Sequence, residues 1–139
     1  MTVKYLLDTN IVSENLRPEP NRNILARFKQ HVDEIAIPAV GWHELWYGAK
    51  RLQPSRKRTA LEEYLDQVLA PAVPILPYDE RAAEWHATER PPLMRIGKTP
   101  AFADGQIAAI AFVNDLILVT LNTFDYANFD AITIEDWSR

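Results

Sequence analysis

The chain of 139 residues contains no cysteine, only four glycines and no long hydrophobic run. Without cysteine the chain has no disulfide and no thiolate ligand for a metal ion, which fits the cytoplasm. The small number of glycines argues against a glycine-rich phosphate-binding loop. No stretch reaches the roughly 18 apolar residues of a spanning helix, and the apolar run 3–7 is too short for a signal peptide. We therefore expect one cytoplasmic domain, residues 1–139, with no membrane partner.

An excess of basic residues is also lacking. Lys and Arg number 15 against 19 Asp and Glu, which gives a formal charge of −4. A general nucleic-acid binder is basic, so any contact with nucleic acid must be local or assisted by a metal ion. The densest basic group is Lys50, Arg51, Arg56, Lys57 and Arg58. Either it contacts an RNA backbone, or it is a solvated helix start in which Arg58 pairs with Glu62.

Apolar periodicity predicts strands that alternate with helices. Strands are expected at 3–7, 35–37, 73–76, 116–121 and 131–134, and helices at 11–16, 21–31, 40–52, 55–70, 79–90 and 102–114. Strands 3–7 and 116–121 are apolar without strict alternation, which is typical of a parallel sheet covered on both faces. Pro74 favours an edge position for its strand. Residues 91–100, rich in proline and basic residues, are expected to form a long loop. The predicted fold class is α/β.

Several polar side chains stand where these elements begin or end. Asp8 follows the first strand, Glu44 lies early in the third helix, and Asp104 interrupts the apolar string AFADGQIAAIAF. Asn122 and Asp125 follow the strand at 116–121. Strand ends and helix starts share one edge of a parallel sheet, and ligands bind in open α/β sheets beyond the carboxyl ends of the strands. We therefore expect these groups to face one crevice.

Several carboxylates in one crevice repel each other unless a cation neutralises them. Oxygen ligands without thiolates or paired histidines indicate Mg²⁺ or Mn²⁺. Each acid also has an ordinary structural interpretation: Asp8 and Asp125 as turn residues, Asp104 as a helix cap and Glu44 as a solvated helix residue. The set as a whole favours a metal site.

Four segments carry a resemblance to a known family: LLDTNIVSENLR, IPAVGWHELWYGAKR, AFADGQIAAIA and LILVTLNTFDYANF. Together with the late Trp137 they resemble PIN-domain ribonucleases and, more closely, VapC-type toxins of bacterial toxin–antitoxin pairs. The resemblance covers nearly the whole chain, in order. It implies a three-layer PIN-like domain with a five-stranded parallel sheet flanked by helices. It also implies a metal-dependent endoribonuclease that hydrolyses RNA phosphodiester bonds, forms a homodimer and is neutralised by a cognate antitoxin protein.

The same resemblance implies which residues form the site. Asp8, Glu44 and Asp104 match three acids that bind Mg²⁺ or Mn²⁺ in the family. The fourth position falls on Asn122, with Asp125 three residues further on. Asn122 positions a water but cannot neutralise a cation, whereas Asp125 supplies charge. Which of the two completes the catalytic set stays open at this point.

Other residues are candidates for supporting roles. Thr9 is expected to orient Asp8, and Arg90, Arg95 and Lys98 are candidates for contact with substrate phosphate. Leu121 stands where many relatives carry Arg, which removes one possible phosphate contact.

The aromatic residues of the helix 40–52 suggest a partner surface. Trp46 is expected in the core, and Trp42 and Tyr47 are expected on an exposed patch for a protein partner.

Two alternatives belong to other classes. One is a catalytically weak PIN domain that acts mainly as a protein-binding module. The other, an aspartyl-phosphate enzyme with Asp8 as nucleophile, is disfavoured because Asn10 stands where a second acid is wanted.

Overall fold

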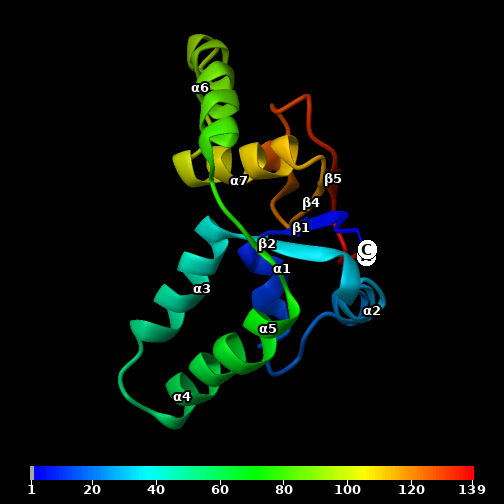
Figure 1. Cartoon of the computed structure of the whole chain (residues 1–139), viewed down its shortest axis with the longest axis vertical. Coiled ribbons are helices and arrows are strands. Elements are labelled where there is room, and N and C mark those ends of the chain that lie inside the picture. Colours follow the sequence, from blue (N-terminus) through cyan, green and yellow to red (C-terminus); the bar gives the residue numbers. More distant parts are fainter. Residues whose placement is uncertain (1) are drawn as a thin grey trace.

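Five parallel strands form one sheet at the centre of the molecule (Figure 1). The structure is a computed structural model, and it describes residues 2–139. The strand order is β3-β2-β1-β4-β5. The strands are β1 (Tyr5–Leu7), β2 (Ile35–Pro38), β3 (Ile75–Leu76), β4 (Ile117–Val119) and β5 (Ile134–Glu135). The predicted five-stranded parallel sheet is confirmed, and β3 lies at its edge as Pro74 suggested.

Helices connect the strands at nearly the expected positions. They are α1 (Thr9–Glu14), α2 (Arg22–Gln30), α3 (Ala39–Lys50), α4 (Arg56–Glu63), α5 (Ala70–Ala72), α6 (Glu80–Arg95) and α7 (Phe102–Val113). Shorter turns are η1 (Val32–Glu34), the π-helical η2 (Tyr64–Leu69) and η3 (Thr123–Tyr126). Side-chain hydrogen bonds cap the first turn of several helices. Ser55 accepts from the Arg58 amide and Asp79 accepts from the Ala82 amide, which satisfies amides that lack a partner within the helix.

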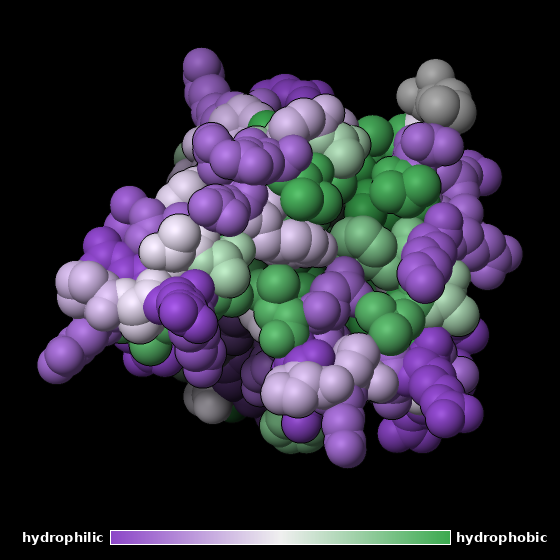
Figure 2. Space-filling model, turned by 90° about the horizontal axis from the view of Figure 1, so that it is seen from below, coloured by the Kyte–Doolittle hydropathy of each residue, from purple (hydrophilic) through white to green (hydrophobic). Residues whose placement is uncertain are grey.

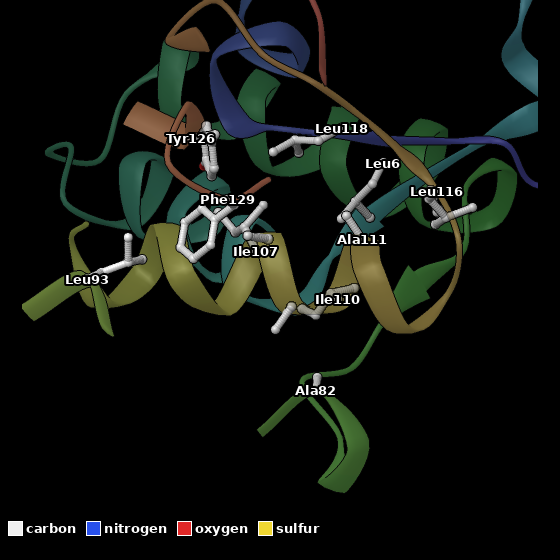
Figure 3. Packing of buried hydrophobic residues seen from close by; sticks show 13 residues of the cluster. Leu6, Ala82, Leu93, Ile107, Ile110, Ala111, Leu116, Leu118, Tyr126 and Phe129 are labelled. Atoms are coloured by element: carbon white, nitrogen blue, oxygen red, sulfur yellow. The ribbon is translucent and has the colours of Figure 1, made fainter. Parts of the chain in front are cut away.

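The sheet separates two buried clusters, which makes the fold three-layered. Leu6 and Leu118 point to one face and pack with α7 residues such as Ile107. Leu7 and Val119, the next residues along the same strands, point to the other face and pack against α1, α2 and α3. Figure 3 shows the first cluster, with Phe129 beside Ile107. Because neighbouring residues of β1 are buried on opposite faces, the strand reads as a continuous apolar run.

The prediction of a long loop at 91–100 is wrong. Helix α6 continues through Pro91 and Pro92 to Arg95, so the connection to α7 is only 96–101. Proline inside a helix costs a hydrogen bond and strains the turn before it. Two features offset this cost: Leu93 is buried, with 8% of its surface exposed, and a closing motif ends the helix.

The closing motif depends on Gly97. Its φ is +70°, a left-handed conformation that glycine adopts at no steric cost. The Gly97 amide donates to the Met94 carbonyl at 3.1 Å, and the Lys98 amide donates to the Leu93 carbonyl at 2.9 Å. This pair of bonds is the Schellman motif, which satisfies the last carbonyls of a helix.

The basic group around α4 is a paired helix surface. Arg58 Nε lies 2.7 Å from Glu62 Oε1, and Lys50 Nζ lies 2.8 Å from Glu62 Oε2. Hydrogen bonds from Lys50 and Arg58 lower the pKa of Glu62 below its usual value. Two of the five cations are therefore matched by an acid, which supports the structural interpretation of this group over an RNA contact.

The aromatic residues of α3 differ in part from expectation. Trp46 and Trp42 are both partly buried against the second cluster, with their rings edge to face at 6.1 Å. Trp42 is therefore not the exposed residue expected. Tyr47 is 60% exposed, as predicted.

Seen from below (Figure 2), hydrophilic side chains cover the margins of the surface, and hydrophobic ones gather from the centre towards the upper right of the view. Among residues 2–139, no helix is long and apolar enough to cross a membrane.

Candidate active site at the carboxyl end of β1

Asp8 is fixed at the point where β1 ends and α1 begins. Its backbone is extended and forms the N-cap of α1, where Oδ1 accepts from the Thr9 amide at 2.8 Å. Its other oxygen, Oδ2, accepts from the Thr120 hydroxyl at 2.8 Å. Only 7% of Asp8 is exposed. The carboxylate is therefore buried. Two segments that are far apart in the sequence orient it: Thr9, which begins α1, and Thr120, which follows β4.

Tyr126 joins Asp8 to Asp104. The phenol is fully buried, and its oxygen lies 3.2 Å from Asp8 Oδ2 and 3.2 Å from Asp104 Oδ1. Burial, followed by the charges of these two acids, raises the pKa of Tyr126, so the hydroxyl keeps its proton. A phenol has one proton and donates to one carboxylate at a time. The contact therefore places two acids around a single hydroxyl.

Asp104 lies in the first turn of α7 and resists ionisation. Burial raises its pKa most, the hydrogen bond from Tyr126 lowers it, and the charges of Asp8, Asp125 and Glu44 raise it further. The three other predicted acids thus all act on Asp104 electrostatically. This is the arrangement in which a cation is most strongly favoured, because the cation relieves repulsion among the carboxylates.

The acids do not converge as tightly as the sequence suggests. Among residues 2–139, no three His, Asp or Glu side chains gather closely enough to form a ready-made metal site. Asp8 and Asp104 lie around one hydroxyl, whereas Glu44 and Asp125 are exposed at the margin. The donors are all carboxylate oxygens, which suit a hard cation such as Mg²⁺ that retains several waters. The residues present therefore fit such an ion held by two acids and water.

Asn122 and Asp125 differ in how they meet the site. The Asn122 side chain is exposed, and its backbone amide donates to Thr120 Oγ1 at 3.0 Å. Thr120 in turn donates to Asp8, so Asn122 supports Asp8 through its backbone. Asp125 lines an open groove together with Asp104. Of the two candidates, Asp125 is the one whose side chain shares a groove with Asp104.

Glu44 faces a separate small pocket. It lies on α3 and lines this pocket together with Thr9. The Thr9 hydroxyl is buried without a hydrogen-bond partner, close to Gly41. The expectation that Thr9 orients Asp8 is met by its backbone amide, and the hydroxyl takes no part in that bond.

The three candidate phosphate contacts are scattered. Lys98 lines the groove that contains Asp104. Arg90 lies over the ring of Phe102 at 5.1 Å, and Arg95 is exposed in the last turn of α6, outside the groove lining. Only Lys98 shares a groove with one of the acids.

Sequence reasoning missed Thr120 and Tyr126. Thr120 follows an apolar strand and offers no periodic signal. Tyr126 stands beside Asp125 in TFDY, and nothing in that string shows that the phenol turns inward. The only signal in the sequence was that both residues, which lie close to Asp125 in the chain, carry a hydroxyl group.

The raised pKa of Asp104 predicts how stability depends on pH. The folded state keeps the Asp104 proton above pH 3.8, the ordinary value, so the free energy of unfolding contributed by this group falls as pH rises through the raised pKa. We expect Asp104→Asn to gain stability relative to wild type as pH rises from 4 to 7, in EDTA. Urea unfolding of both proteins at several pH values measures this, and Mg²⁺ should shrink the difference. A constant difference across that range would contradict the expectation.

Gly105 allows α7 to approach α6. A Cβ added there would overlap the imidazole of His86, which is 3% exposed and lies 3.0 Å from the Tyr78 hydroxyl. Gly105→Ala is therefore expected to destabilise the protein by about 1–3 kcal/mol, although alanine favours helices. Urea unfolding measures the loss, and adding His86→Ala should recover part of it. Full additivity of the two changes would show that the contact is not responsible.

The fold and site define a class of protein: a three-layer α/β domain with two acids around a buried hydroxyl at the carboxyl end of its central strand. A family model described as "PIN domain" matches residues 5–131. Toxin FitB from Neisseria gonorrhoeae is 36% identical over 95% of this chain and 97% of its own length. A tRNA(fMet)-specific endonuclease VapC from Shigella flexneri is 31% identical over 98% and 99%.

A solved structure agrees with these sequence matches. FitAB bound to a DNA fragment contains a chain that superimposes with a TM-score of 0.90 at 31% identity, over 97% of this chain and 96% of that one. The chain belongs to the PIN domain family and is similar throughout its length to VapC-type toxins.

Proposed function

We propose that this protein is an endoribonuclease toxin that uses Mg²⁺ or Mn²⁺ and is neutralised by a cognate antitoxin protein. One observation carries the proposal: Asp8 and Asp104 lie around one buried hydroxyl, 3.2 Å from each, at the carboxyl end of β1. The names of the relatives, a toxin and a tRNA endonuclease, support RNA as the substrate.

The residues of this chain divide the work. Asp8 and Asp104 would hold the cation, which supplies an activated water and positive charge against the phosphodiester. Thr120 and the Thr9 amide keep Asp8 in one orientation, so little reorganisation is needed when substrate arrives. Asp125, in the same groove as Asp104, adds negative charge to the site. In this assignment Glu44 completes the charge from the side of α3.

Lys98 is the candidate for contact with substrate phosphate, and the proposed protein partners are a second copy of the chain and the antitoxin. Lys98 would bind a substrate phosphate in the groove, where its charge opposes the repulsion between RNA and the acids. We propose that this protein forms a homodimer in the cytoplasm and that the antitoxin holds the dimer inactive.

The test is cleavage of total RNA by purified protein. We expect cleavage with Mg²⁺ or Mn²⁺, none with EDTA, and growth arrest on expression that co-expression of the antitoxin relieves. Isothermal titration with Mn²⁺ reports the ion independently of activity. A folded protein that neither binds Mn²⁺ nor cleaves RNA would overturn the proposal and favour the protein-binding module instead.

A further inference from the structure

Phe124 is exposed beside the candidate active site without a structural reason. With 86% of its surface exposed, it is the most exposed of the large hydrophobic side chains described between residues 2 and 139. It belongs to η3, where Tyr126, two residues on, is fully buried against the acids. The buried phenol anchors the turn from the inside, and Phe124 lies on its outer side.

Phe124 lines the groove that contains Asp104. This groove has a volume of about 480 Å³ and is also lined by Lys98, Asp125 and Asn128. One flat aromatic face, one cation and one amide thus share a groove with the half-buried Asp104. Such a set offers a stacking surface, a phosphate contact and a hydrogen-bonding group, which together match the parts of one nucleotide.

We propose that Phe124 stacks on an unpaired base of the RNA next to the phosphate that is cleaved, so that the substrate is single-stranded at this point. The inference rests on the proposed function. Every base has a π face, but only an unpaired base can leave its neighbours and stack on a side chain. A protein partner is less favoured as the occupant, because Phe124 is the one aromatic residue of a groove that also carries Lys98, Asp104, Asp125 and Asn128, and its apolar neighbours there are small.

The test uses single-stranded RNA of mixed sequence with 2-aminopurine placed at successive positions. Binding is measured in an Asp104→Asn background so that the RNA stays intact. We expect quenching of one 2-aminopurine position in this background, and loss of that quenching together with about tenfold weaker binding in Phe124→Ala. Phe124→Leu, which keeps apolar bulk but has no π face, should resemble Phe124→Ala, whereas Phe124→Trp should retain the quenching.

Two controls isolate the stacking contact. Phe112→Leu changes an exposed phenylalanine near the other end of α7 and should leave affinity unchanged. The same RNA annealed to its complement should bind weakly, and with equal affinity, to the Asp104→Asn protein with Phe124 and to the Asp104→Asn protein that also carries Phe124→Ala. In the cleaving chain, Phe124→Ala should raise KM with little change in kcat.

The outcomes separate this inference from the proposed function. If wild type cleaves RNA while Phe124→Ala and Phe124→Leu bind and cleave as wild type does, the stacking role is wrong and the function stands. If these variants lose only antitoxin binding, the groove is a protein-docking surface and the inference is also overturned. If wild type does not cleave RNA but binds the single strand through Phe124, the proposed function fails and the stacking role survives.

Discussion

Replacing Asp104 by Asn is expected to lower RNA cleavage by at least about a hundredfold while the domain stays folded. The amide keeps the size of the side chain and can still accept from the Tyr126 hydroxyl. It carries no charge, so it cannot neutralise a cation beside Asp8. Because burial and the neighbouring acids raise the pKa of Asp104, removing its charge also relieves repulsion at neutral pH. Single-turnover cleavage in Mg²⁺, Mn²⁺ titration and thermal unfolding together measure the three effects.

A matched control lies at the other end of the same helix. Asp115 is exposed just after α7 with φ +55°, a conformation that asparagine tolerates well. Asp115→Asn makes the same chemical change and removes the same charge, and it should cleave RNA and arrest growth as wild type does. If Asp104→Asn retained full activity, or if both variants lost it equally, Asp104 would not be a residue of the catalytic site.

The position of the two central acids was predictable because it follows from elementary sheet geometry. Asp8 ends an apolar strand, and Asp104 breaks an apolar helix near its start; both points fall at the same edge of a parallel sheet. Tyr126 was not predictable in the same way. Its contact with both carboxylates depends on η3 folding back under the strand ends, and four residues of turn carry no periodic pattern.

The margins of the site show a second limit of sequence reasoning. Glu44 is exposed on α3 and lines a pocket with Thr9, outside the groove that contains Asp104 and Asp125, although its charge still acts on Asp104. A helix that follows a parallel strand must begin at the edge of the sheet where the carboxyl ends of the strands lie. The direction of a given side chain, however, depends on the tilt of that helix. Spacing along the sequence does not fix this tilt.

The connection between α6 and α7 illustrates a competition between local and tertiary energies. Pro91 and Pro92 favour a helix end, and local propensity alone predicts a loop after residue 90. Burial of Leu93 and the bonds at Gly97 extend the helix by another turn. Gly97 was the available signal, because helices very commonly end with a glycine in the left-handed conformation just past the last helical residue.

Trp137→Ala is expected to destabilise the protein by about 3–5 kcal/mol. Trp137 is fully buried in the second cluster. Its ring meets Tyr5 of β1 edge to face at 5.2 Å and His31 at 5.5 Å, and its Nε1 donates to Glu135 Oε1 at 3.1 Å. A domain of this size has a total stability of about 5–15 kcal/mol, so the variant should be marginally stable. Urea unfolding followed by circular dichroism measures the loss.

Trp137→Phe provides the matched comparison. It keeps an aromatic ring against Tyr5 and loses the Nε1 hydrogen bond and part of the volume, so we expect a smaller loss, about 1–2 kcal/mol. Tyr47→Ala, at an exposed position of α3, should change stability little. Trp137 packs on the strand that precedes Asp8, and its indole donates to Glu135 and not to an acid of the site, so its loss should lower cleavage only through the unfolded fraction. At low temperature, cleavage per folded molecule in Trp137→Ala should equal that of wild type, whereas Asp104→Asn should remain inactive at every temperature. Equal activity of the two variants per folded molecule would show that the packing of β1 and the chemistry at its end are not separable.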